Sequence, residues 1–266
     1  DIYHTGTVEQ RLDEDGLAVA QADVTPAYTN ALSGRGTFSH RTRRVERLWR
    51  TFGYDRVEDV IVVFDQVRAT KASFRKRWLL HTLNEPAVSG QGFRVRVAPQ
   101  SRPGRAGGSL AANVLLPKDA SITAVGGRGL EFFVDGVNYD EHGTLLKDNR
   151  RTGPANGDPG AWRVEISTAR ENADDQFLVV LLPTLGDSVS THRVRLLESG
   201  NRVGCEIIGT HRTTRWWFEP GSKSVEIELV DRDGATRKHR LPDSSAPSAV
   251  APSWIERLRA WGGARS

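Results

Sequence analysis

Apolar and polar residues alternate along most of the chain, in short runs separated by Gly, Asn, Asp and Pro. A period of two in β-branched and aromatic residues is typical of β-strands, and the 3.6-residue period of helices is nearly absent. The pattern predicts strands over residues 43–52, 57–69, 76–83, 92–98, 110–116, 130–134, 162–168, 176–183, 192–198, 202–208, 213–218, 224–229 and 236–241. We therefore predict an all-β protein built as an antiparallel β-sandwich.

Turn chemistry supports antiparallel pairing. Gly, Asn and Asp cluster at residues 135–136, 199–201 and 231–234, and these residues accept the positive φ at which a strand reverses. The runs 60–64 and 177–182 are apolar at consecutive positions, which is typical of strands covered on both faces. We expect these two runs to form the centre of a sheet.

Loop-like composition divides the chain into three parts. We expect residues 1–100 to belong to a central β-sandwich and residues 101–243 to continue it or to form a second, smaller one, because residues 98–108 are rich in Gly, Pro and Arg. Residues 244–266 are predicted to form a linker rich in Pro, Ser and Ala, and then a tail helix.

The predicted tail helix is short and amphipathic. Ser253 and Glu256 have the spacing of a capping box, in which each side chain bonds a backbone N–H of the first turn. Trp254, Leu258 and Trp261 then lie on one helical face. The pattern fits a tail helix that docks on the sandwich and equally a tail that does not belong to the fold.

Composition is that of a folded protein rather than a disordered or membrane-spanning one. The 266 residues are 38% hydrophobic and 26% charged, and no run approaches the ~18 apolar residues of a membrane span. The 37 basic residues exceed the 33 acidic ones by 4, and most are arginines. This excess is compatible with an anionic partner, but also with a mixed, solvated surface.

Several kinds of chemistry are excluded by missing signatures. No phosphate-binding glycine loop, nucleophile elbow or His-Glu-x-x-His motif is present, which argues against a nucleotide enzyme, an α/β hydrolase and a zincin. Cys205 is the single cysteine, so no internal disulfide forms, and we expect it to be buried in strand 202–208. The seven histidines are at least nineteen positions apart, so a metal site requires distant segments to meet.

Residues 41–50 are the densest basic stretch. On a strand, Arg41, Arg43, Arg47 and Trp49 share one face, and Arg44, Glu46 and Arg50 share the other. Arginines beside an aromatic ring suit a groove for an acidic sugar chain. A solvated face with cross-strand ion pairs explains the pattern equally well, and nothing in the sequence is similar to a nucleic-acid-reading module.

Five blocks of sequence, within about residues 1–185, resemble the β-sandwich of heparinase II/III-like polysaccharide lyases. The resembling residues are 47–52, 60–86, 115–127, 133–139 and 160–166. The family joins an N-terminal α/α toroid to C-terminal antiparallel sandwiches and cleaves uronate-containing polysaccharides by β-elimination. The resemblance thus implies the C-terminal sandwich part of a lyase acting on alginate or a glycosaminoglycan, with a periplasmic or secreted location.

The resemblance also implies where the chemistry lies. In the family, a toroid tyrosine and a sandwich histidine perform the elimination, and both they and the ligands of a structural, zinc-like metal are expected upstream of this chain. No catalytic residue can therefore be carried over from the family to this chain. We expect the chain to contain no cofactor or metal ligand, to be inactive alone, and to bind a toroid domain or chain besides acidic polysaccharide. Nucleic acid and membranes are not expected partners. The absence of methionine predicts an internal fragment or a processed product.

The N-terminal strands are implied to lie nearest the family's substrate cleft. Their residues of suitable chemistry, taken as candidate substrate-binding residues, are Tyr3, His4, His40, Arg43 and Arg44. Asp65, Trp78 and His81 are assigned structural roles; His81 shares a strand face with Leu79 and Arg77, and is interpreted as a hydrogen-bonded residue at a sheet edge. The alternative function is a non-catalytic carbohydrate-binding or structural sandwich.

Overall fold

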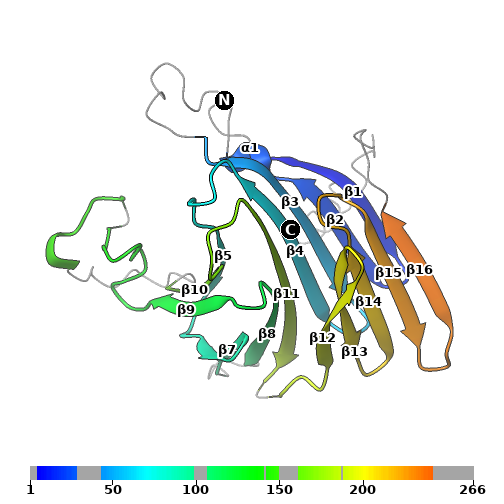
Figure 1. The fold of residues 1–266 in the computed structure, drawn as a ribbon. Helices are drawn as coiled ribbons and strands as arrows, with labels where there is room; N and C mark the ends of the chain where they lie inside the picture. The colour runs from blue at the N-terminus through cyan, green and yellow to red at the C-terminus, as the bar shows by residue number, and fades with distance from the viewer. Residues whose placement is uncertain are drawn as a thin grey trace, which may run out of the picture.

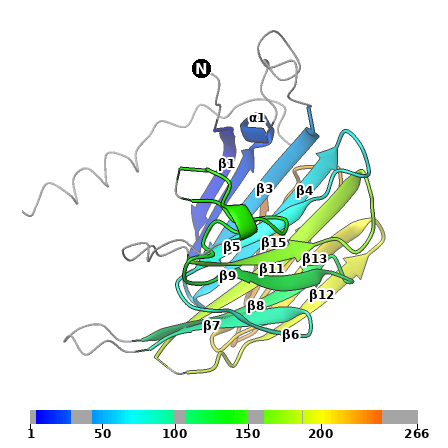
Figure 2. The ribbon, with the colours of Figure 1, turned by 90° about the vertical axis from the view of Figure 1, so that its left-hand side faces the viewer.

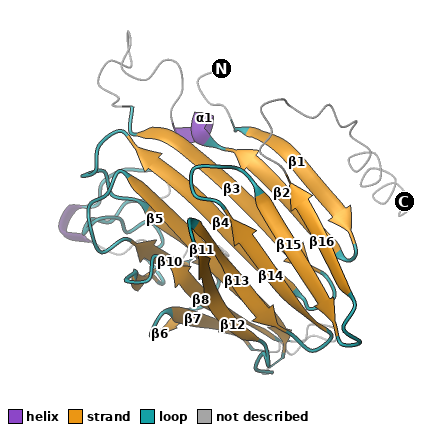
Figure 3. Cartoon of the chain, turned by 45° about the vertical axis from the view of Figure 1, so that its right-hand side comes forward, coloured by secondary structure: helices purple, strands orange, loops and turns teal. Residues whose placement is uncertain are grey.

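The structure is a computed structural model of the chain, and its strands form three antiparallel sheets (Figures 1 and 2). The residues that it describes are 5–28, 43–98, 107–140, 142–149, 161–186 and 188–241. Strands make up most of this part, as Figure 3 shows. The predicted all-β, antiparallel fold is confirmed.

The central sheet has eight strands. In spatial order they are β1 (Thr7–Glu14), β2 (Leu17–Asp23), β3 (Val45–Asp55), β4 (Val60–Ala69), β11 (Asp174–Leu185), β8 (Gly108–Leu116), β7 (Gly92–Val97) and β6 (Ala87–Ser89). Strands from both sides of residue 100 therefore pair in one sheet. The division into a 1–100 and a 101–243 sandwich stays a prediction.

A smaller sheet packs on each face of the central sheet. The three-stranded sheet has the order β5 (Arg77–Thr82), β10 (Trp162–Ser167) and β9 (Ser121–Gly126). The five-stranded sheet is a meander of β12 (Arg193–Ser199), β13 (Arg202–Ile208), β14 (Arg212–Phe218), β15 (Val225–Asp231) and β16 (Thr236–Leu241). The helical segments of the described residues are α1 (Thr25–Tyr28) and a 3₁₀ turn, η2 (Lys147–Asn149).

Strands β4 and β11 contribute to two separate cores. Val62, Phe64 and Leu178 point toward the five-stranded sheet, whereas Val63 and Val179 belong to the core under the three-stranded sheet. All five are at most 5% exposed. The prediction that both runs are central strands covered on both faces is confirmed.

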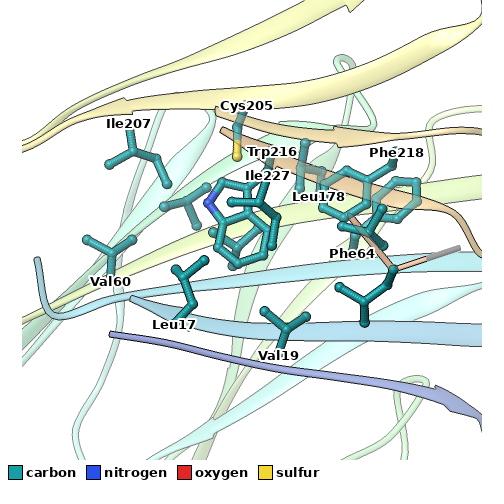
Figure 4. Packing of buried hydrophobic residues seen from close by; sticks show 14 of the residues in the cluster. Leu17, Val19, Val60, Phe64, Leu178, Cys205, Ile207, Trp216, Phe218 and Ile227 are labelled. Carbon is teal, nitrogen blue, oxygen red and sulfur yellow. The ribbon is translucent and has the colours of Figure 1, made fainter. Parts of the chain in front are cut away.

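The larger core is built around Trp216 of β14 (Figure 4). Its indole is fully buried and packs against the backbone of Gly53 on β3, where an added Cβ would overlap the ring. Phe64 and Phe218 stack beside it with ring centroids 4.2 Å apart. Cys205 is also fully buried here, as predicted, and burial raises the pKa of its thiol.

Two buried carboxylates join the β3–β4 turn to the five-stranded sheet. Asp55 accepts hydrogen bonds from Nε and Nη2 of Arg212 at 3.1 and 2.6 Å. Glu58 accepts the backbone N–H groups of Thr210 at 2.7 Å and Arg212 at 2.6 Å, and lies 3.0 Å from Nε2 of His192. Burial raises the pKa of Glu58, but these backbone bonds and His192 outweigh it, so the pKa is lowered.

Some predicted elements differ from those observed. Residues 130–134 form turns with an isolated bridge between Val134 and Val137, and not a strand. Strands β1, β2, β6 and β9 and helix α1 were not predicted. The tail helix from Ser253, like the rest of the predicted 244–266 linker and tail, lies outside the described residues.

Gly53→Ala should destabilise the protein by about 1–3 kcal/mol, because a methyl group would be forced into the packed Trp216 ring. Urea unfolding measures the change. In a Trp216→Leu background, where space is available, the same glycine substitution should cost much less. Equal costs in both backgrounds would show that the contact does not limit the packing.

The lowered pKa of Glu58 predicts a loss of stability in acid. A carboxyl group whose pKa is lower in the folded than in the unfolded state stabilises the fold above its unfolded pKa, and this contribution disappears as pH falls through the folded value. Urea midpoints measured from pH 7 to pH 3 should therefore fall less steeply for Glu58→Gln than for the unmodified chain. Parallel profiles would contradict the assignment.

Candidate functional site

A groove lies where the three-stranded sheet ends over the central sheet. Its cavity has a volume of about 770 Å³, within the range of ligand sites. Strands β3 and β4 form one side, and the segment before β5 with the start of β5 forms the other. The lining residues are Tyr28, Arg44, Val45, Leu48, Arg50, Asp65, Val67, Ala69, Ser73, Phe74, Arg75, Lys76, Arg77, Trp78, Leu79, Asp135 and Phe177.

Arg50 and Asp65 form a two-bond ion pair on the central sheet. They are direct cross-strand partners on β3 and β4, with Nε–Oδ1 at 2.7 Å and Nη2–Oδ2 at 2.5 Å. Burial raises the pKa of Asp65 by more than Arg50 lowers it, whereas the Arg50 side chain is 45% exposed. The carboxylate thus fixes one edge of the guanidinium and leaves the group accessible from the groove.

Two further cations are held by carboxylates. Nζ of Lys76 lies 2.9 Å from Oδ2 of Asp175 and donates to the carbonyl oxygen of Asn172 at 2.5 Å. Arg77 donates to Asp135, and this bond lowers the pKa of the Asp135 carboxyl. Because Lys76 and Arg77 already have carboxylate partners, we assign these two pairs to the wall of the groove.

Two other cations lie over the ring of Phe74, and a third follows it in the sequence. Arg44 Cζ and Lys71 Nζ lie 5.4 and 5.9 Å from the ring centroid, and Arg75 is its neighbour in sequence. All three side chains are exposed, and among the described residues none of them takes part in an ion pair. We call Arg44, Lys71 and Arg75 the Phe74 cation cluster. It presents positive charge beside an aromatic surface, without a carboxylate bonded to it.

The candidate substrate-binding residues fall into three groups. Arg44 lines the groove, as a binding role requires. Arg43 is exposed beside it and does not line the groove; its carbonyl oxygen accepts the Thr70 hydroxyl at 2.7 Å. Tyr3, His4 and His40 lie outside the described residues.

The sequence interpretation overlooked the second side of the groove. Residues 73–77 lie in the basic run 71–77, which is visible in the sequence inside one of the family-like blocks but is not among the candidate substrate-binding residues. Of the residues assigned structural roles, Trp78 is buried in the core beneath β5, and Asp65 is buried in its ion pair. His81 is exposed on β5, an edge strand.

The described residues offer neither a cluster of metal-binding side chains nor a membrane-spanning helix. No group of three or more His, Cys, Asp or Glu side chains there could hold a metal ion. No helix in the same part of the chain has the length and hydrophobicity that a bilayer crossing requires.

Comparison with known proteins gives a likeness of fold. A heparan sulfate lyase, HepC, from Pedobacter heparinus aligns with 91% of this chain at 11% identity and a TM-score of 0.47, and a mutant of HepC aligns at 10% identity with the same TM-score. The fold resembles part of a heparan sulfate lyase. The chain covers 28% of each HepC chain. No model of a known protein family matches it, and no curated protein does.

Arg50→Ala should leave Asp65 buried without its partner and destabilise the chain by about 3 kcal/mol at pH 7. Removing Arg50 also removes the interaction that lowers the Asp65 pKa, so that pKa should rise further. A carboxyl group whose pKa is higher in the folded than in the unfolded state destabilises the fold when the pH lies above the folded pKa. This penalty disappears as the pH falls below the unfolded pKa. The deficit measured by urea unfolding should therefore shrink from pH 7 to pH 4.

The double variant Arg50→Ala/Asp65→Asn is the matched control, since it has no carboxyl group to titrate at this position. Its stability relative to the unmodified chain should depend less on pH. If Arg50→Ala alone shows a constant deficit over this range, Asp65 is not the group that responds.

Proposed function

We propose that this chain is the C-terminal β-sandwich part of a polysaccharide lyase that cleaves a uronate-containing acidic polysaccharide by β-elimination, and that the groove binds the polysaccharide. The observation that carries the proposal is the Phe74 cation cluster. None of its three cations has an ion pair among the described residues, and two of them, Arg44 and Arg75, line an open groove. The blocks of family-like sequence support the same reading.

The chemistry of the groove suits an acidic sugar chain. A guanidinium group binds carboxylate or sulfate oxygens through two parallel N–H donors. Phe74 is half-buried among the cations, and the apolar face of a sugar ring can pack on such a surface. Arg50, held from behind by Asp65, adds a cation in a fixed orientation. Alginate and glycosaminoglycans both meet these requirements.

In β-elimination a base removes the C5 proton while the C6 carboxylate is neutralised. The cations of the groove are suited to bind uronate carboxylates and to offset their charge. We assign the base to the toroid and sandwich strands of the complete enzyme, together with any structural metal, and expect this chain to need that toroid as its partner. A periplasmic or secreted location belongs to the same proposal.

A non-catalytic carbohydrate-binding sandwich is the second candidate. One observation favours it: the described lining of the groove includes no histidine, and its carboxylates Asp65 and Asp135 are both bonded to arginines. In that case binding would be the whole function of the chain.

Binding should depend on the Phe74 cation cluster. We expect the chain to bind alginate or heparan sulfate in isothermal titration at low salt, and Arg44→Ala and Arg75→Ala each to weaken binding about fivefold, as for a solvent-exposed ion pair. Arg232→Ala, an exposed arginine on the distant β15–β16 turn, is the control and should bind normally. The proposal fails if neither polysaccharide binds, or if all three variants bind like the unmodified chain.

The isolated chain should bind without cleaving. Incubation with alginate or heparan sulfate should give no rise in the ultraviolet absorbance of unsaturated uronate, because the proposed base is not in this chain. The complete enzyme, or this chain with its toroid partner, should give the rise. Activity of the isolated chain would place the base here and refute this part, whereas an inactive complete enzyme would favour the non-catalytic candidate.

A further inference from the structure

A second cavity, of about 350 Å³, adjoins the groove. It is lined by residues 72–77 on one side and residues 167–171 on the other. These belong to the two connections that cross between the central and the three-stranded sheet, from β4 to β5 and from β10 to β11 (Figure 1).

The two connections run side by side. At the three-stranded sheet the two connections meet at Arg77 and Ser167, which are backbone partners on β5 and β10. At the central sheet they meet at Arg68 and Asp174, which are backbone partners on β4 and β11. The N–H of Ala69 also donates to the carbonyl oxygen of Ala173 at 2.8 Å. The second cavity therefore has walls fixed to both sheets, and is not an accident of one exposed loop.

One short segment separates the two cavities and lines both. The shared residues are Ser73, Phe74, Arg75, Lys76 and Arg77. Lys76 and Arg77 already have carboxylate partners, whereas Arg75 is exposed and has no ion pair in the described part of the chain. Arg75 is thus the cation that a ligand in either cavity can reach.

The far wall of the second cavity adds another cation. Arg170 is exposed and, within the described residues, is not ion-paired. The hydroxyl groups of Ser167 and Thr168 line the same wall, and Glu171 is the carboxylate that opposes the positive charge. Arg44 in the groove, Arg75 between the cavities and Arg170 beyond it thus follow one another across the two sites.

We propose that the two cavities are consecutive positions on one binding track, and that a single linear anionic polysaccharide passes from one to the other over Arg75. This proposal rests on the function proposed above and narrows its ligand to a chain longer than the groove alone can hold. Once one part of the polysaccharide is bound in one cavity, its contact with the other cavity forms at high effective concentration. Affinity should consequently increase with chain length.

A length series tests the track. Oligosaccharides of two, four, six and eight sugars, prepared from whichever of alginate and heparan sulfate binds the chain, are titrated against the unmodified chain and the variants Arg170→Ala, Arg170→Glu, Arg44→Ala and Arg232→Ala. Unfolding midpoints in urea check that each variant is folded. All of these substitutions are at exposed residues, so the urea midpoints of the variants should agree with that of the unmodified chain.

Arg170→Ala should weaken the octasaccharide about fivefold and leave the disaccharide unchanged, and Arg170→Glu should have a larger effect of the same kind. Arg44→Ala should weaken both lengths, and Arg232→Ala neither. The salt dependence of octasaccharide binding should also decrease in Arg170→Ala, since one ionic contact is lost.

The outcomes separate the two proposals. If Arg44→Ala weakens binding but both Arg170 variants keep the normal length dependence, the track is wrong and the proposed function stands. If no oligosaccharide or polymer binds, the proposed function fails and the track fails with it.

Discussion

The burial of β4 and β11 on both faces is the constraint on which the rest of the structure depends. Val62 and Val63, adjacent on β4, belong to different cores, so each face of the central sheet must be covered by another layer. The five-stranded sheet covers one face. The three-stranded sheet covers the other only in part: Phe52 on β3, paired with Val63, remains 43% exposed on that face. The groove follows from this geometry, because it lies along the line where a narrow layer ends over a wider one.

The charged side chains near the edge of the three-stranded sheet are of two kinds: those bonded to a partner within the fold, and those without an ion pair among the described residues. Asp65 is buried at this edge, where an ionised carboxylate without a partner would cost free energy of folding. Arg50 offsets that cost through its hydrogen bonds to the carboxylate. Lys76 is tied to Asp175 in the same way and joins the two crossing connections. The bonds of Lys76 to Asp175 and Asn172 anchor the segment that carries Phe74, two residues earlier in the chain. Under the proposed function, cations presented from a segment anchored in this way reduce the entropy that a ligand must overcome on binding.

The sequence predicted those features that depend on local pattern. Alternation and turn residues located most strands, including β13 and β16 at their observed limits. Strand β2 was missed because alanines at every second position, from Ala18 to Ala22, blur the contrast between its two faces. Of the residues that line the groove, only Arg44 is among the candidate substrate-binding residues named from the sequence. Its second side, 73–77, lies some thirty residues further along the chain and meets Arg44 only through the three-dimensional path from β4 to β5, which alternation does not encode.

The five-stranded sheet shows why arginine content alone was a poor guide to a site. One row across it consists of Arg195, Glu206, Arg215, Glu228 and Lys238, each the cross-strand partner of the next. Four ion pairs of 2.6, 2.8, 2.8 and 3.5 Å connect the row, so each of its cations is bound to a carboxylate within the sheet itself. The Phe74 cation cluster is made of the same residue types, but its cations are not in ion pairs among the described residues. What distinguishes the Phe74 cation cluster from this row is therefore the pairing of the charges, and in the row that pairing is set by strand register rather than by composition.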